Sequence, residues 1–144
     1  MNESQMSIWK ALYAMVWLAF LEIAILFFRR LTIAPLVVAV DAHVVLGLAI
    51  LGLAYYDNAA IKKTQAPDRL KRIVKATLAL AVFQIVLGAP LYLNLRFLFG
   101  FPFVEVVDFL HLVIALAIIT QAASVATAYD MWEEHEFALL PKPL

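Results

Sequence analysis

The chain has 144 residues, of which 65% are hydrophobic and 15% charged, and its mean hydropathy is +0.91. A soluble domain has about half apolar and a quarter charged residues, so this composition excludes an ordinary soluble domain and predicts an integral membrane protein. The absence of cysteine excludes disulfides, thiolate ligands and thiol redox chemistry. No length remains for a second domain, so we expect residues 1–144 to form one domain.

Four apolar stretches follow one another along the chain, at approximately residues 8–28, 36–56, 76–95 and 103–129. Each is long enough to cross a bilayer as a helix, which needs about 20 apolar residues. The first stretch is too long for the apolar part of a cleaved signal, ends in Arg29-Arg30 and is followed by no small-residue cleavage site. We therefore predict a multi-pass protein of the cell membrane, folded as an all-α, antiparallel four-helix transmembrane bundle.

Basic residues are distributed unevenly although the net charge is zero. Most of them lie between the second and third stretches: Lys62, Lys63, Arg69, Lys71, Arg72 and Lys75. Lys10 and Lys142 fall on the same side of a four-span protein, whereas the opposite side carries only Arg29, Arg30 and Arg96. Because basic residues concentrate in cytoplasmic loops, we predict that this loop and both termini are cytoplasmic. The loop is expected to contact membrane lipid, and it carries no nucleic-acid-binding module.

Two histidines, His43 and His111, lie inside the second and fourth stretches in similar surroundings. Val, Leu, Ala and Ile recur two, five, six and seven positions after each histidine. A small residue, Gly47 or Ala115, follows four positions after it, on the same helix face. The pattern predicts a cleared space beside each imidazole in which a flat, bulky group can lie.

Depth and direction favour a shared ligand for the two histidines. Pro35 precedes His43 by eight residues and Pro102 precedes His111 by nine, and proline suits the first turn of a helix. Both imidazoles therefore lie roughly 12–14 Å below the outer helix starts. The second and fourth helices of such a bundle run parallel on a diagonal of about 12–14 Å, which two imidazoles with an iron between them would bridge.

We therefore predict that His43 and His111 are axial metal ligands of one haem, with haem B as the expected cofactor. Two alternatives remain open at this point. Each histidine could instead make an interhelical hydrogen bond, as polar side chains in membranes often do. A non-haem metal would need carboxylates to complete its coordination, and those near the histidines are few.

A weaker internal repeat links the first and third stretches. Residues 19–23 (Ala-Phe-Leu-Glu-Ile) can be laid over residues 81–85 (Ala-Val-Phe-Gln-Ile), which pairs Glu22 with Gln84. The chain thus resembles two helix pairs related by a pseudo-twofold axis along the membrane normal.

Three segments carry a resemblance to a known family: residues 21–32 (LEIAILFFRRLT), 83–88 (FQIVLG) and 110–116 (LHLVIAL). They are similar to haem A synthases, which have eight spans in two four-helix halves, so the chain looks like a half-length member. The resemblance implies a histidine pair on the second and fourth helices, which maps onto His43 and His111. It also implies oxidation of a methyl group of haem O towards haem A, with electrons from an external donor that the sequence does not identify. One chain has one histidine pair, so we expect a homodimer or higher homo-oligomer.

The chain departs from the family at one position. The family carries a glutamate three residues before the first histidine, where this chain has Val40. The same spacing occurs on the other histidine helix, where Asp108 precedes His111 and could accept a proton or orient the imidazole. Alternatively, Asp108 is an interfacial acid that is solvated or paired with Arg96.

Glu22 is the second candidate catalytic residue. It lies seven residues before Arg29, hence roughly 10 Å deep, where a carboxyl group is costly unless neutral or paired. It could relay protons or support a helix–helix contact. Arg30 and Arg96 are the candidate partners of haem propionates, or else ordinary interface anchors.

Two other functions remain possible. A b-type cytochrome exchanging electrons with quinone or a respiratory partner needs only the histidine pair, and the missing glutamate favours it. A haem-free scaffold remains if both histidines are structural.

Overall fold

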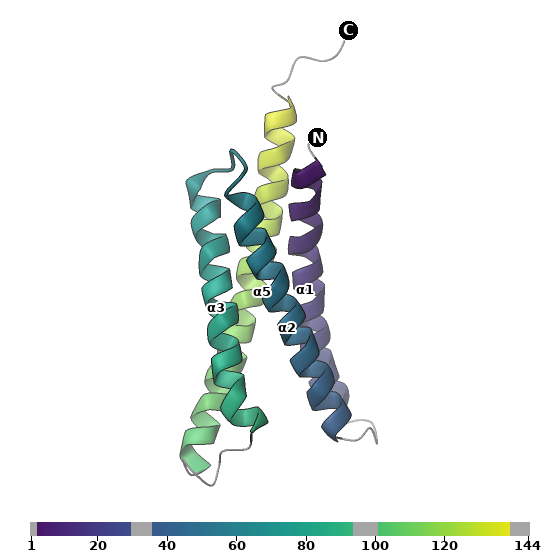
Figure 1. The fold of residues 1–144 in the computed structure, drawn as a ribbon, viewed down its shortest axis with the longest axis vertical. Helices are drawn as coiled ribbons and strands as arrows, with labels where there is room; N and C mark the ends of the chain where they lie inside the picture. The colour runs from purple at the N-terminus through teal and green to yellow at the C-terminus, as the bar shows by residue number, and fades with distance from the viewer. Residues whose placement is uncertain (1–2, 30–35, 94–100, 139–144) are drawn as a thin grey trace.

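The computed structural model describes residues 3–29, 36–93 and 101–138 and shows an all-helical chain (Figure 1). Its helices are α1 (Glu3–Arg29), α2 (Leu36–Ile61), α3 (Asp68–Tyr92) and α5 (Phe101–Ala138). Each contains a segment long and apolar enough to cross a membrane: Ile8–Ile25, Val38–Ile61, Asp68–Tyr92 and Pro102–His135. The predicted all-α class, with four helices of membrane-spanning length, is confirmed.

The four helices contact one another in a ring. Neighbours along the chain touch, and α1 also touches α5. Within the described residues, no Cα atom of α2 lies within 8 Å of a Cα atom of α5, so these two helices face each other across the diagonal. Figure 1 shows that α1 begins and α5 ends at the same end of the molecule as the α2–α3 connection. At the opposite end, the pairs α1/α2 and α3/α5 diverge.

The α2–α3 connection is closed by local hydrogen bonds. The Thr64 hydroxyl donates to the carbonyl of Ile61 at 2.8 Å and accepts from the Ala66 N–H at 3.2 Å. Pro67, at φ −55° and ψ 144°, stands before the first turn of α3, and its carbonyl accepts from the Leu70 N–H at 2.9 Å. Proline is well tolerated at a helix start because its missing N–H would have no partner inside the helix.

Helix limits differ from the apolar stretches expected from the sequence. Helix α3 begins at Asp68, well before residue 76, and α5 continues past residue 129 to Ala138. Hydropathy marks only the apolar part of a helix, whereas the backbone hydrogen bonds continue through polar turns of good helix formers such as Lys, Arg and Glu. At 1.5 Å per residue, the 38 residues of α5 extend about 57 Å, well beyond a hydrocarbon core of about 30 Å.

Large buried side chains gather toward the end of the bundle that carries the α2–α3 connection. The largest fully buried ones are those of Tyr129, Ile8, Leu12, Met15, Ile61, Val125 and Asp57. Along the rest of the helices many large apolar side chains are exposed, for example Trp17 at 70% and Phe109 at 65%. So much exposed apolar surface exceeds what a soluble monomer carries and suits contact with lipid.

Candidate functional site

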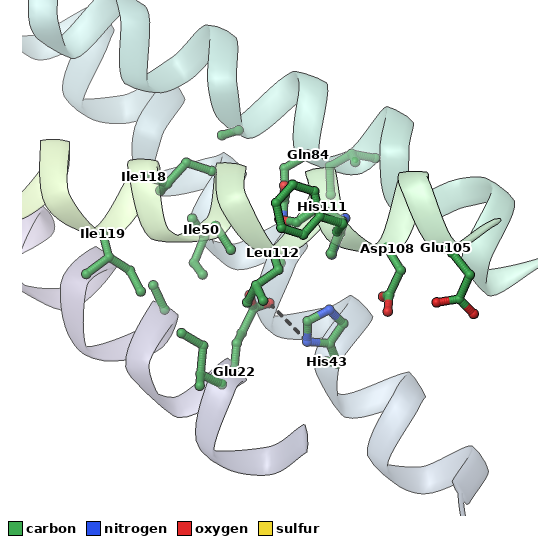
Figure 2. Close-up of a pocket in the computed structure, with 17 residues that line it drawn as sticks. Glu22, His43, Ile50, Gln84, Glu105, Asp108, His111, Leu112, Ile118 and Ile119 are labelled. Atoms are coloured by element: carbon green, nitrogen blue, oxygen red, sulfur yellow. Dashed lines mark hydrogen bonds and ion pairs between the residues drawn. The ribbon is translucent and has the colours of Figure 1, made fainter. Parts of the chain in front are cut away.

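A cavity of about 480 Å³ lies between the helices, and all four of them line it. Its volume falls within the range of about 300–1,000 Å³ that is usual for small-molecule sites. The polar lining residues are Glu22, His43, Gln84, Glu105, Asp108 and His111. Most of the remaining lining residues are aliphatic, so the cavity is an apolar chamber with a few polar groups directed into it (Figure 2).

The structure brings the two predicted histidines together in this cavity. His43 comes from α2 and His111 from α5, and their ring centres lie 6.0 Å apart at an interplanar angle of 56°. A metal–imidazole bond is about 2.0–2.1 Å long, so two rings on opposite sides of one ion have nitrogens about 4 Å apart and centres about 6 Å apart. The distance between the ring centres thus equals the one that a shared metal ion would require.

Several polar atoms around the cavity are buried without a hydrogen-bond partner among the described residues. They include Nδ1 of both His43 and His111, Oε1 of Glu22 and Oε1 of Gln84. A buried polar group left unpaired costs about 1–3 kcal/mol, and native structures hold few of them. All four atoms lie around one chamber, and two of them, Glu22 Oε1 and His43 Nδ1, are 3.9 Å apart.

The described residues cannot complete a metal site by themselves. Over residues 3–29, 36–93 and 101–138, no group of three or more His, Cys, Asp or Glu side chains could hold a metal ion. Two imidazoles without further protein ligands suit a metal that brings its other ligands with it, as the iron of a porphyrin does. The donor set thus suits a haem better than a bare ion.

Two glycines shape the surroundings of the polar groups. A Cβ atom on Gly88 of α3 would lie 3.1 Å from Cε1 of His111, so this glycine leaves room for the ring. A Cβ atom on Gly47 would lie 3.1 Å from Oε1 of Glu22. Gly47 and Ala115 both line the cavity, but the space beside Gly47 is shared with the Glu22 carboxylate rather than left for a flat ligand alone. Gly88 was not predicted as a site residue.

The side chain of Gln84 ties α3 to α5 at the level of the site. Its Nε2 donates a hydrogen bond of 2.9 Å to the main-chain carbonyl of His111. One turn of α3 separates Gln84 from Gly88, so α3 contacts both the backbone and the ring of this histidine. Sequence reasoning paired Gln84 with Glu22 but predicted no role for it at the site.

Three carboxylates line the cavity, at two different places. Glu22 Oε1 lies 3.9 Å from His43 Nδ1, and both side chains are largely buried. Asp108 and Glu105 are both exposed residues of α5, and Figure 2 shows them together at one end of the cavity. Glu105 is not among the predicted site residues, although its position one helical turn before Asp108 places both carboxylates on the same face of the helix.

The predicted propionate partners cannot be placed, because Arg30 and Arg96 lie outside the described residues. The third histidine, His135, is exposed near the end of α5 and does not line the cavity. Comparison of the chain with protein-family profiles, with curated proteins and with solved structures finds no match. The function is therefore inferred from the residues of the site.

Proposed function

We propose that the chain is a haem-binding membrane protein that resembles haem A synthase, in which His43 and His111 would hold the iron of one haem. The observation that supports this most directly is the pair of imidazoles with ring centres 6.0 Å apart across the α2/α5 diagonal. The apolar lining of the cavity is further support. A bound haem supplies a one-electron centre whose potential depends on its axial ligands.

Under this proposal, the activity is oxidation of a methyl group of haem O by an oxidant that comes from outside the protein. The protein's part is to bind the macrocycle, to exclude water with its aliphatic walls and to hold protons on carboxylates beside it. Asp108 and Glu22 are the candidate catalytic residues because both line the cavity. Arg30 and Arg96 are the proposed propionate partners, and Gly47 and Ala115 contribute to the space for the ring system.

The proposed setting is the cell membrane, with an antiparallel bundle whose termini are cytoplasmic. The exposed Lys62, Lys63, Arg69 and Arg72 lie at or beside the α2–α3 connection, at the same end as the beginning of α1. The positive-inside rule assigns that end to the cytoplasm, where it meets anionic lipid. A homodimer would provide the two haem sites that an eight-span synthase contains within one chain.

A second candidate function is that of a b-type cytochrome that carries electrons to or from quinone or a respiratory partner. Val40 favours it, because the chain lacks the glutamate that the family carries at that place. This function needs the same histidine pair but no carboxylate chemistry.

Haem binding is tested by the reduced-minus-oxidised spectrum of the purified protein. We expect a low-spin haem signal in the wild type and its loss in His43→Ala and in His111→Ala. His135→Ala is the matched control, since this exposed histidine lies away from the cavity, and it should keep the signal. A wild type that takes up no haem, or single variants that keep the low-spin signal, would overturn the proposal.

Co-expression with a source of haem O, followed by pigment extraction, separates the two functions. Haem A that appears with the wild type and disappears with Asp108→Ala supports the synthase activity. Haem O that stays unchanged beside a bound low-spin haem supports the electron carrier instead.

A further inference from the structure

The two sides of the histidine site match in position but differ in charge. Glu22 on α1 and Gln84 on α3 occupy equivalent places in the internal repeat, and both line the cavity. Gln84 donates from Nε2 to the backbone of His111. Glu22 instead approaches the ring of His43, with Oε1 3.9 Å from Nδ1. One imidazole therefore has an acid beside its ring, and the other has a neutral amide bound to its backbone.

We propose that Glu22 is a positioning residue for His43, a role that rests on the proposed haem function. Its carboxylate accepts a hydrogen bond from Nδ1–H of His43, which leaves Nε2 of that ring free to bind the metal. In Figure 2 a dashed line joins Glu22 to one ring nitrogen of His43, and the second ring nitrogen is not joined to Glu22. A carboxylate on one nitrogen fixes both the tautomer and the orientation of a metal-ligating histidine.

The two atoms have no competing partner in the part of the chain that the structure describes. Both Glu22 Oε1 and His43 Nδ1 are buried and without a hydrogen bond. The gap of 3.9 Å is about 1 Å longer than a hydrogen bond, a difference that small side-chain rotations close. Because an unpaired carboxylate inside a membrane is costly, pairing with the imidazole is the arrangement that lowers the free energy of both groups.

The carboxylate also occupies a place that is shaped to receive it. A Cβ atom on Gly47 would lie 3.1 Å from Glu22 Oε1 and 3.9 Å from Ile85 Cδ1, so a side chain at position 47 would push against the carboxylate. Gly47 thus lets α2 pass close to Glu22, one turn beyond His43 on the same face. The acid, the glycine and the imidazole form one local arrangement between α1 and α2.

This arrangement is expected to affect the reduction potential of the proposed haem. A carboxylate on Nδ1–H makes the ring a more basic ligand, which favours oxidised over reduced iron. Removing such a partner typically weakens metal binding about 10–100-fold. For a one-electron couple, each tenfold loss of preference for the oxidised state raises the midpoint potential by about 59 mV.

The test is redox titration of haem-loaded Glu22→Gln, with Glu134→Gln as the matched control because Glu134 is an exposed acid outside the cavity. We expect Glu22→Gln to bind haem about tenfold more weakly and to have a more positive midpoint potential. Glu22→Asp, which keeps the carboxylate, should fall between this variant and the wild type, and Glu134→Gln should match the wild type. Wild-type affinity and potential in Glu22→Gln would overturn the inference.

A second measurement does not depend on haem. Histidine ¹⁵N chemical shifts of the haem-free protein report the tautomer of His43, with exposed His135 as the reference for a solvated ring. The pairing is supported if His43 carries its proton at Nδ1 in the wild type and is a mixture of both tautomers in Glu22→Gln. This holds even if the wild type takes up no haem and the proposed function fails. A tautomer unaffected by Glu22→Gln overturns it. If Glu22→Gln does not fold, the wild type is compared with Glu22→Asp instead. A larger share of the Nε2–H tautomer in Glu22→Asp supports the pairing, and an unchanged tautomer overturns it.

Discussion

Replacing Gly88 with alanine puts a methyl group against the ring of His111. The new Cβ would lie 3.1 Å from Cε1 and 3.7 Å from Nδ1, whereas carbon atoms in ordinary contact are about 3.5–4.0 Å apart. The ring must therefore move by about 0.4–0.9 Å. Since its centre is 6.0 Å from that of His43, near the separation that a shared metal would require, the move would disturb the proposed metal ligation. Overpacking of this kind costs about 1–3 kcal/mol, or about 5- to 150-fold in haem affinity.

The assay is titration of haem into haem-free protein, followed by absorbance. Gly52→Ala is the control because a Cβ at Gly52 meets nothing within 4 Å. Both substitutions gain about 1 kcal/mol of helix propensity, so both should raise the resistance of the haem-free protein to unfolding apart from any clash. We expect Gly52→Ala to bind haem like the wild type and Gly88→Ala to bind it more weakly, with an altered low-spin spectrum. A Gly88→Ala protein with wild-type affinity and spectrum would refute the reasoning.

Two further predictions concern stability, measured as unfolding in detergent micelles. The Thr77 hydroxyl donates to Gln121 Oε1 at 3.0 Å and links α3 to α5. A double-mutant cycle of Thr77→Val and Gln121→Leu should give a coupling free energy of about 0.6 kcal/mol, the average for hydrogen bonds between membrane helices. A coupling free energy of zero would mean that this hydrogen bond contributes nothing to stability. The Tyr129 hydroxyl is buried with no hydrogen-bond partner among the described residues, so Tyr129→Phe should stabilise the fold by about 1 kcal/mol, while exposed Tyr55→Phe should not. A less stable Tyr129→Phe would show that the hydroxyl has a partner such as bound water.

Hydropathy was sufficient to predict four membrane-length helices, because an apolar run of this length has few other folds available to it in lipid. It was not sufficient for the helix limits. The segment from Asp68 to Lys75 is rich in charged residues, so hydropathy predicts a loop there, yet it is helical because Pro67 precedes the first turn and its residues are good helix formers. Helix ends depend on capping and helix propensity, which a hydropathy count does not include.

The site was predictable where it depended on spacing within one helix. Matched neighbours and matched depth pointed to His43 and His111, whose rings the structure places in one cavity. Contacts between different helices were not predictable, because they depend on the rotation of each helix about its own axis. For this reason the sequence alone does not predict that Gly88 lies beside the ring of His111, or that Gly47 lies beside Glu22.

The diagonal position of the two histidines has a mechanical consequence. Helices α2 and α5 have no close backbone contact within the described residues. No backbone contact along this diagonal therefore restrains the two helix pairs from sliding past each other. An iron bound by one imidazole from each helix would link α2 to α5, and the free energy of haem binding would then add to the stability of the folded protein. The lifetime of the protein in the membrane would consequently depend on the supply of haem. In haem-deficient cells, the haem-free bundle would be less stable and more readily degraded by proteases.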